Sequence, residues 1–213
     1  MKLVIFDFDG TLGDTCANII KTMQDTLRAL SHPMAGEEAI RATIGLPLEE
    51  GFRVLLPGVP EEGILRCAQV YREIFEENKK ELVPGLFPHV AETLQALRDR
   101  GIVLSVASSR RAKSLNGFLQ DMEIAHFVSY VIGADGVEKA KPDPEPVLKT
   151  LQALGFSASE TLVVGDMPVD ILMGSRAGAR TCGVTYGNAS RADLLAAGAD
   201  YIIDDMAELL AIV

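Results

Sequence analysis

Long apolar runs and a surplus of basic residues are both missing from this sequence of 213 residues. No run approaches the roughly 20 apolar residues that a membrane-spanning helix needs, so we expect no membrane partner. Acidic residues outnumber basic ones by 30 to 20, and the resulting net charge of −10 argues against binding to nucleic acid. The composition therefore points away from two large classes of partner.

Cysteine and histidine are also scarce, and neither is spaced like a set of metal ligands. The three cysteines are far apart, odd in number and form no C-x-x-C motif, which argues against a disulfide framework or a zinc site. The three histidines show no ligand spacing either. The first predicted strand begins directly after Met1-Lys2, which leaves no room for a signal peptide, so we expect a cytoplasmic protein.

What the sequence does contain is an alternation of strand and helix patterns from Phe87 onward. Apolar runs predict strands over 102–107, 130–132, 161–164, 181–184 and 201–203, with helical periodicity between them. Such alternation is typical of right-handed βαβ units and a parallel sheet. We therefore expect an α/β fold with a doubly wound, Rossmann-like parallel sheet as its core. No G-x-G-x-x-G follows a strand, which argues against a nucleotide-cofactor domain.

Residues 14–83, by contrast, show helical patterns only. The periodicity places Leu65 on the inward face of a helix in this region, and Leu148 on the buried stripe of a later helix. We predict a core domain of residues 1–13 and 84–213 with an inserted helical cap domain, residues 14–83. Turn residues at its edges, Gly13 and 83–85, suit the hinges of a closing lid, although a rigid subdomain fits the sequence equally well.

The run Leu3–Phe6 predicts a strand buried on both faces, yet two carboxylates, Asp7 and Asp9, follow it at once. Other polar groups follow a predicted strand or precede a helix, namely Ser108, Lys141, Asp166 and Asp170. Because ligands bind at the carboxyl ends of strands in open α/β sheets, we expect these groups to share one cleft. Four carboxylates so close together would raise one another's pKa values unless a cation neutralised them. Since Mg²⁺ prefers oxygen ligands, the cluster predicts a magnesium site.

The same cleft has features that suit an anion. Ser108-Ser109 is expected at the start of a helix, where backbone N–H groups and the helix dipole attract phosphate. Lys141 supplies a positive charge that can touch both a carboxylate and a phosphate oxygen. Each feature alone has a plainer interpretation, a capping serine or a solvent-facing lysine. The order of the whole set along the chain is what indicates a site.

These segments resemble the four motifs of the haloacid dehalogenase-like (HAD) phosphohydrolase superfamily. The matching stretches are Asp7-Phe8-Asp9-Gly10-Thr11, Ser108 after its strand, Lys141-Pro142, and Gly165-Asp166 followed by Asp170. The strand pattern fits this superfamily over nearly the whole chain. A helical insertion directly after the first motif resembles the small helical cap of the phosphoglycolate phosphatase-like branch.

The resemblance implies a role for each matching residue. Asp7 would attack phosphorus and form an aspartyl-phosphate, and Asp9 would protonate the leaving oxygen and then activate water. Mg²⁺ would be held by the Asp7 side chain, the Asp9 backbone carbonyl and Asp166. Asp170 would steady waters or Lys141. The residues expected to bind the phosphate or the rest of the substrate are Gly10, Thr11, Ser108, Ser109, Arg110 and Lys141.

The reaction that we predict is Mg²⁺-dependent hydrolysis of a small-molecule phosphate monoester, with phosphoglycolate-like substrates favoured. A phosphosugar mutase of the β-phosphoglucomutase type and an inorganic pyrophosphatase stay open, as does a catalytically idle phosphate-binding protein. Gly45-Leu46-Pro47-Leu48 stands where the mutase branch has Gly-x-Ser-Arg, which argues against a mutase. The cap candidates for selecting the leaving group are Arg41, Gly45, Leu46 and Arg53. We expect a monomer or a weak homodimer.

Overall fold

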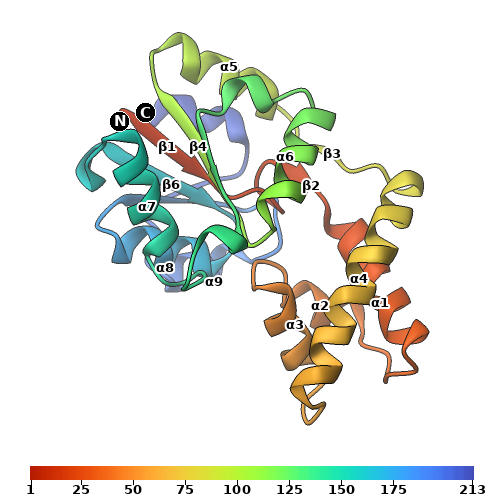
Figure 1. Cartoon of the computed structure of the whole chain (residues 1–213). Helices are drawn as coiled ribbons and strands as arrows, with labels where there is room; N and C mark the ends of the chain where they lie inside the picture. The colour runs from red at the N-terminus through yellow and green to blue at the C-terminus, as the bar shows by residue number, and fades with distance from the viewer.

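The computed structural model describes residues 1–213 and has a six-stranded parallel sheet at its centre (Figure 1). The strand order is β5-β4-β1-β6-β7-β8. The strands are β1 (Leu3–Phe6), β4 (Val103–Ala107), β5 (Tyr130–Ile132), β6 (Thr161–Gly165), β7 (Arg180–Val184) and β8 (Tyr201–Ile203). The α/β fold predicted from the sequence is confirmed. β1 lies between β4 and β6, where the strand order reverses, and a crevice at the carboxyl ends is expected there.

Helices cover both faces of this sheet, which explains the unbroken apolar run of β1. Val4 and Phe6 belong to the larger hydrophobic cluster, together with residues of α5 (Val90–Asp99) and α6 (Ala112–Asp121). Leu3 and Ile5 belong to a second cluster with α7 (Glu145–Leu154) and α8 (Pro168–Arg176). Successive side chains of a strand point to opposite faces, so each face of β1 is buried in its own cluster.

Shorter segments complete the sheet region. They are α9 (Arg191–Ala196) and the 3₁₀ turns Ala125–Phe127, Ala134–Gly136, Ala158–Glu160 and Met206–Ala211. None of the helices combines the length and the apolar character that spanning a membrane requires.

Four helices gather beside the sheet domain, at the lower right of Figure 1. They are α1 (Cys16–Ala29), α2 (Glu37–Arg41), α3 (Leu48–Leu55) and α4 (Glu61–Glu81), and both α1 and α3 pack against α4. The chain enters and leaves this region through a short antiparallel pair, β2 (Gly13–Asp14) and β3 (Gly85–Leu86). The cap boundaries 14–83 stay a prediction, and the pairing of these two short strands at its edges supports it.

Two residues predicted to point inward are exposed instead. Leu65 in α4 is 52% exposed and Leu148 in α7 is 48% exposed, so both predictions are wrong. Each leucine follows a buried residue, Ile64 or Val147, and is therefore turned by about 100° around the helix axis. Only the face of each helix that carries Ile64 or Val147 packs against a neighbouring element. The buried face predicted from periodicity alone was wider than the one observed.

Candidate active site

The carboxyl ends of three adjacent strands bring together the polar groups that the sequence singles out. Phe6 at the end of β1 is level with Val106 of β4 and Val164 of β6, so Asp7 follows at the same height as the ends of its neighbours. Six polar side chains converge there and all are buried: Asp7, Asp9, Ser108, Lys141, Asp166 and Asp170. The grouping that strand order predicted is therefore present, while the chemical roles stay predictions.

Lys141 joins two of these carboxylates. Its Nζ lies 2.6 Å from Asp7 Oδ1 and 2.7 Å from Asp170 Oδ1, and all three side chains are at most 5% exposed. Burial acts to lower the pKa of Lys141, but the charges of Asp170 and Asp7 outweigh it and raise that pKa above its usual value. The lysine is therefore a fixed positive charge that holds one oxygen of Asp7 in place.

One ammonium group does not balance the carboxylates around it. Oxygens of Asp7, Asp166 and Asp170 lie within 4.8 Å of one another. Burial raises the pKa of Asp7 well above its usual value. The charge of Lys141 acts to lower this pKa, and the charges of the neighbouring aspartates raise it further. Burial and the charge of Asp170 likewise raise the pKa of Asp166 to about 7. A compact set of buried carboxylate oxygens with surplus negative charge fits a hard divalent cation such as Mg²⁺.

Asp166 is held in position by neutral donors. Asn188 donates from its backbone N and from Nδ2 to Asp166 Oδ2, at 2.8 Å each, and Thr11 Oγ1 lies 3.3 Å from Oδ1. Gly10 passes so close that a Cβ there would lie 2.2 Å from Asp166 Oδ2, and its φ of +86° also favours glycine. Sequence reasoning missed Asn188, although it follows β7 and the strand-end argument applied to that strand would have found it.

Asp9 forms an ion pair with a different cation, Arg110. Arg110 Nε lies 2.8 Å and 2.7 Å from the two Asp9 oxygens, and Thr15 Oγ1 donates to Oδ1 at 2.5 Å. The guanidinium lies over both Phe75 in α4 and Phe118 in α6, at 4.8 Å and 4.7 Å from their ring centroids. This cation–π packing joins the helical region to the sheet domain directly at Asp9.

Ser108 and Ser109 lie in a loop, not at the helix start that was expected. α6 begins only at Ala112, and its first N–H donates to Asp135 Oδ1 at 2.8 Å. The predicted placement of these serines at a helix start is therefore wrong, because four loop residues separate β4 from α6 and a carboxylate of the chain already accepts from the helix's first N–H. Their binding of phosphate stays a prediction. Ser109 Oγ instead donates to Gly45 O at 2.6 Å, which links the α2–α3 loop to the sheet domain.

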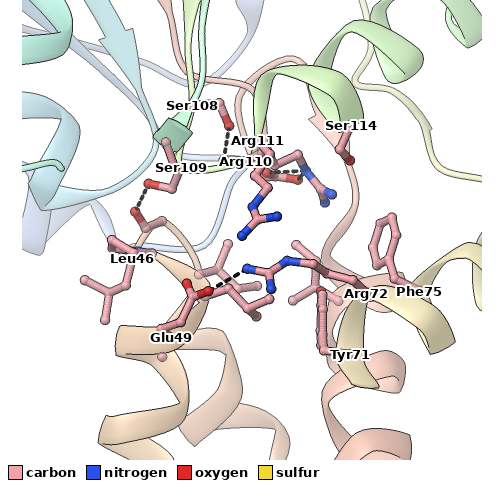
Figure 2. A pocket seen from close by; sticks show the side chains of 18 of the residues that line it. Leu46, Glu49, Tyr71, Arg72, Phe75, Ser108, Ser109, Arg110, Arg111 and Ser114 are labelled. Atoms are coloured by element: carbon pink, nitrogen blue, oxygen red, sulfur yellow. Dashed lines mark hydrogen bonds and ion pairs between the residues drawn. The ribbon is translucent and has the colours of Figure 1, made fainter. Parts of the chain in front are cut away.

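A cavity of about 1080 Å³ opens over Asp7 and Asp9. Figure 2 shows that residues from both regions line it: Ser108, Ser109, Arg110 and Arg111 from the sheet domain, and Leu46, Glu49, Tyr71, Arg72 and Phe75 from the helices. Gly45 and Leu46 line the cavity, as the cap prediction requires.

The two arginines that the sequence proposed for the cap do not line this cavity. Arg53 is wrong as a candidate because its guanidinium binds Glu50 and Glu61 on the exposed side of α3. Arg41 lies at the end of α2 and its Nη1 is 3.4 Å from Asn188 Oδ1. Arg72 in α4 and Arg111 before α6 do line the cavity, but they gave no distinguishing signal because charged residues on helices and in loops are common.

Known proteins share this arrangement over almost the whole chain. The family model described as haloacid dehalogenase-like hydrolase matches residues 4–184. The chain belongs to this family. The membership that the motifs suggested is thus confirmed, and so is the enzyme class, a phosphatase of the HAD superfamily.

Curated relatives of this HAD chain carry several phosphatase names. "Probable phosphatase IndB" of Dickeya dadantii is 40% identical, with 98% of this chain and 91% of the relative covered. "Pyrophosphatase PpaX" of Anoxybacillus flavithermus is 33% identical over 100% and 96%, and "Phosphoglycolate phosphatase" of Vibrio cholerae is 31% identical over 100% and 97%. A crystal structure of a haloacid dehalogenase-like hydrolase from Bacteroides fragilis superposes with a TM-score of 0.90, at 27% identity over 98% and 99%.

Proposed function

We propose that this HAD phosphatase hydrolyses small-molecule phosphate monoesters with Mg²⁺ through an aspartyl-phosphate on Asp7. The observation that carries the proposal is the buried unit of Asp7, Lys141 and Asp170 at the end of β1, of which Asp7 lines the cavity. Lys141 holds Asp7 Oδ1, while no hydrogen bond is made to Oδ2. Oδ2 is therefore the oxygen placed to attack phosphorus, and one hard hydrolysis is divided into two displacements.

In the first displacement a bond forms between Asp7 Oδ2 and phosphorus, and the bond to the leaving oxygen breaks. Asp9 in its protonated form donates its proton to that oxygen. In the second displacement Asp9 takes a proton from water, whose oxygen bonds to phosphorus as the bond between phosphorus and Asp7 Oδ2 breaks and phosphate leaves. Asp9 lines the cavity, where Arg110 and Thr15 fix the direction of its carboxylate. We propose that Ser108 and Lys141 bind the phosphoryl oxygens; Ser108 lines the cavity and Lys141 adjoins it through Asp7.

Three ligands are proposed for Mg²⁺: the side chains of Asp7 and Asp166 and the backbone carbonyl of Asp9. When bound, the ion would neutralise charge on the transferring phosphoryl group. Asp170 contributes by holding Lys141, and Asn188 holds Asp166, so both set the orientation of groups that contact the substrate or the ion. The cleft's surplus of buried carboxylate is the observation that supports a cation here.

Phosphoglycolate-like monoesters and pyrophosphate are the substrates that the names of relatives suggest. The phosphosugar mutase ranks lower because Gly45-Leu46-Pro47-Leu48 offers no serine or arginine for a second phosphate. An idle phosphate-binding protein ranks lowest, since it would not need both Asp7 and Asp9. We also propose that residues 14–83 act as a lid, and that the chain works in the cytoplasm as a monomer or weak homodimer.

The test uses p-nitrophenyl phosphate with Mg²⁺. Asp7→Asn should remove turnover while its circular dichroism spectrum stays the same as that of the parent. EDTA should remove the turnover of the parent protein. Asp99→Asn, an exposed carboxylate on α5, serves as the matched control and should turn over like the parent. Turnover of Asp7→Asn near the parent rate would refute covalent catalysis at this residue. Glucose 1-phosphate with and without its bisphosphate activator separates a hydrolase from a mutase.

A further inference from the structure

Two arginines that the proposed reaction does not use face each other across the cavity. Arg72 extends from α4 and Arg111 from the residue before α6, and Figure 2 shows their guanidinium groups pointing toward one another. One belongs to the helical region and the other to the sheet domain, so the pair spans the boundary between them. Like charges placed this way repel, and an arrangement of this kind needs an anion to be favourable.

The chain itself supplies only part of that anion. Arg72 Nη2 lies 2.6 Å from Glu49 Oε1, with side chains 35% and 26% exposed, while Arg111 makes no ion pair or side-chain hydrogen bond. Burial acts to raise the pKa of Glu49, but Arg72 and the charge of Arg111 together lower it below its usual value. Glu49 thus feels both arginines, and one carboxylate is shared between two cations.

Three of the other cations near the site are already paired, Lys79 with Asp121 among them, while Lys113 lines the cavity without an ion pair. Lys141 binds Asp7 and Asp170, and Arg110 binds Asp9 through both oxygens. Glu76 and Glu138 also line the cavity, but neither is paired with Arg72 or Arg111. The two arginines differ from Lys113 in that their guanidinium groups face each other across the cavity, so together they can hold one anion from both sides.

We propose that Arg72 and Arg111 form a second anion subsite, which binds a carboxylate or phosphate group carried by the leaving group of the substrate. The subsite rests on the proposed phosphatase function and narrows its substrates to phosphate esters with a second anionic group. A planar guanidinium suits two-oxygen contacts with either kind of anion. A cavity of about 1080 Å³ leaves room for a leaving group beyond the phosphoryl group itself.

The subsite also connects substrate charge to the contact between the two regions. Without an anion the facing arginines weaken that contact, and an anion bridging them strengthens it. A substrate with a neutral leaving group, in contrast, leaves the repulsion in place. Substrates are therefore selected by the charge of their leaving group at the boundary between the helical region and the sheet domain, which the cavity crosses.

The test compares two esters, 3-phosphoglycerate and glycerol 3-phosphate, in which a carboxylate of the first is replaced by an uncharged hydroxymethyl group in the second. The ratio of their kcat/KM values should favour 3-phosphoglycerate in the parent and fall about tenfold or more in Arg111→Gln and Arg72→Gln, the loss of a charge-assisted contact. Arg53→Gln, an arginine outside the cavity, should leave the ratio unchanged. Glu49→Gln should increase the ratio, because it frees Arg72, whereas a merely structural role for the pair would not.

Fructose 1,6-bisphosphate and fructose 6-phosphate repeat the comparison with phosphate as the second anion, and show which anion the subsite prefers. A ratio that is the same in the parent and both glutamine variants for both pairs would overturn the proposal. Calorimetric titration of the Asp7→Asn protein with 3-phosphoglycerate and glycerol 3-phosphate gives a readout without turnover. Tighter binding of 3-phosphoglycerate, lost in Asp7→Asn/Arg111→Gln, would support the subsite even if hydrolysis itself failed, and equal binding would refute it.

Discussion

Replacing Lys141 by methionine should destabilise the protein severely when no metal is present. Its Nζ lies 2.6 Å and 2.7 Å from two carboxylates, and the three side chains are 2%, 5% and 1% exposed. Removing one partner of a buried ion pair costs about 3–5 kcal/mol, because the remaining charge is uncompensated. Here two carboxylates lose their partner, so we expect a loss of about 5 kcal/mol. For a chain of this size the loss lowers Tm by about 10 °C or more.

Two conditions should recover part of the stability of Lys141→Met. In the first condition, added Mg²⁺ neutralises the charge of the carboxylates. In the second, a lower pH neutralises it by protonating them. Folding raises the pKa of Asp7 and Asp166, the latter to about 7, so the folded protein binds more protons than the unfolded chain between about pH 4 and that value. Stability therefore rises as pH falls from 8 to 5.5, and it should rise more steeply in the variant, which lacks the charge of Lys141.

The assay is thermal unfolding followed by circular dichroism, in EDTA and in Mg²⁺, at pH 8 and 5.5. Lys149→Met removes a half-buried lysine whose side chain is 41% exposed and pairs with Glu145, and should change Tm little. A Tm for Lys141→Met in EDTA at pH 8 within a degree or two of the parent would refute the reasoning. Equal losses in EDTA and Mg²⁺ would show instead that the ion does not replace the lysine charge.

Three further changes test the site. Mg²⁺ should raise the Tm of the parent, and by more at pH 8 than at pH 5.5, because a proton on Asp166 competes with the ion; a pH-independent shift would contradict this. Asn188→Ala removes the side-chain hydrogen bond to Asp166, keeps the one from the backbone N–H, and should weaken Mg²⁺ binding about 10- to 100-fold by calorimetry, with Asn116→Ala at an exposed position of α6 as the control. Gly10→Ala should remove activity and lower Tm, whereas Gly36→Ala, with open space around it, should do neither; an active Gly10→Ala protein would show that the close approach can relax.

The strand ends that form the site could be predicted from local sequence. A run such as Leu3–Phe6 has to be buried on both faces, and parallel strands present their carboxyl ends at one edge, so carboxylates that follow such runs converge whatever the details of packing. The first motif and Asp166 were found in this way. The same reasoning gave the α/β fold and the position of the helical insertion.

Partners across long stretches of chain were decided by the tertiary structure alone. Sequence could not show that Lys141 binds Asp7 and Asp170 while Arg110 binds Asp9, since these pairings depend on where loops from different strands come to lie. Nor could it show that the helical region contributes Arg72 to the cavity instead of Arg53.

The physical reason is the range of each signal. Hydrophobic periodicity reports which face of a segment is buried, and the end of a strand reports where its polar groups go, because both are properties of a few consecutive residues. The direction of a long charged side chain depends on the elements packed around it, and these are distant in sequence. Residues 3–11 thus indicated by themselves where the polar groups of the candidate site gather, whereas the facing of Arg72 and Arg111, to which we attribute the selection of substrates by charge, was decided only when the helices folded against the sheet.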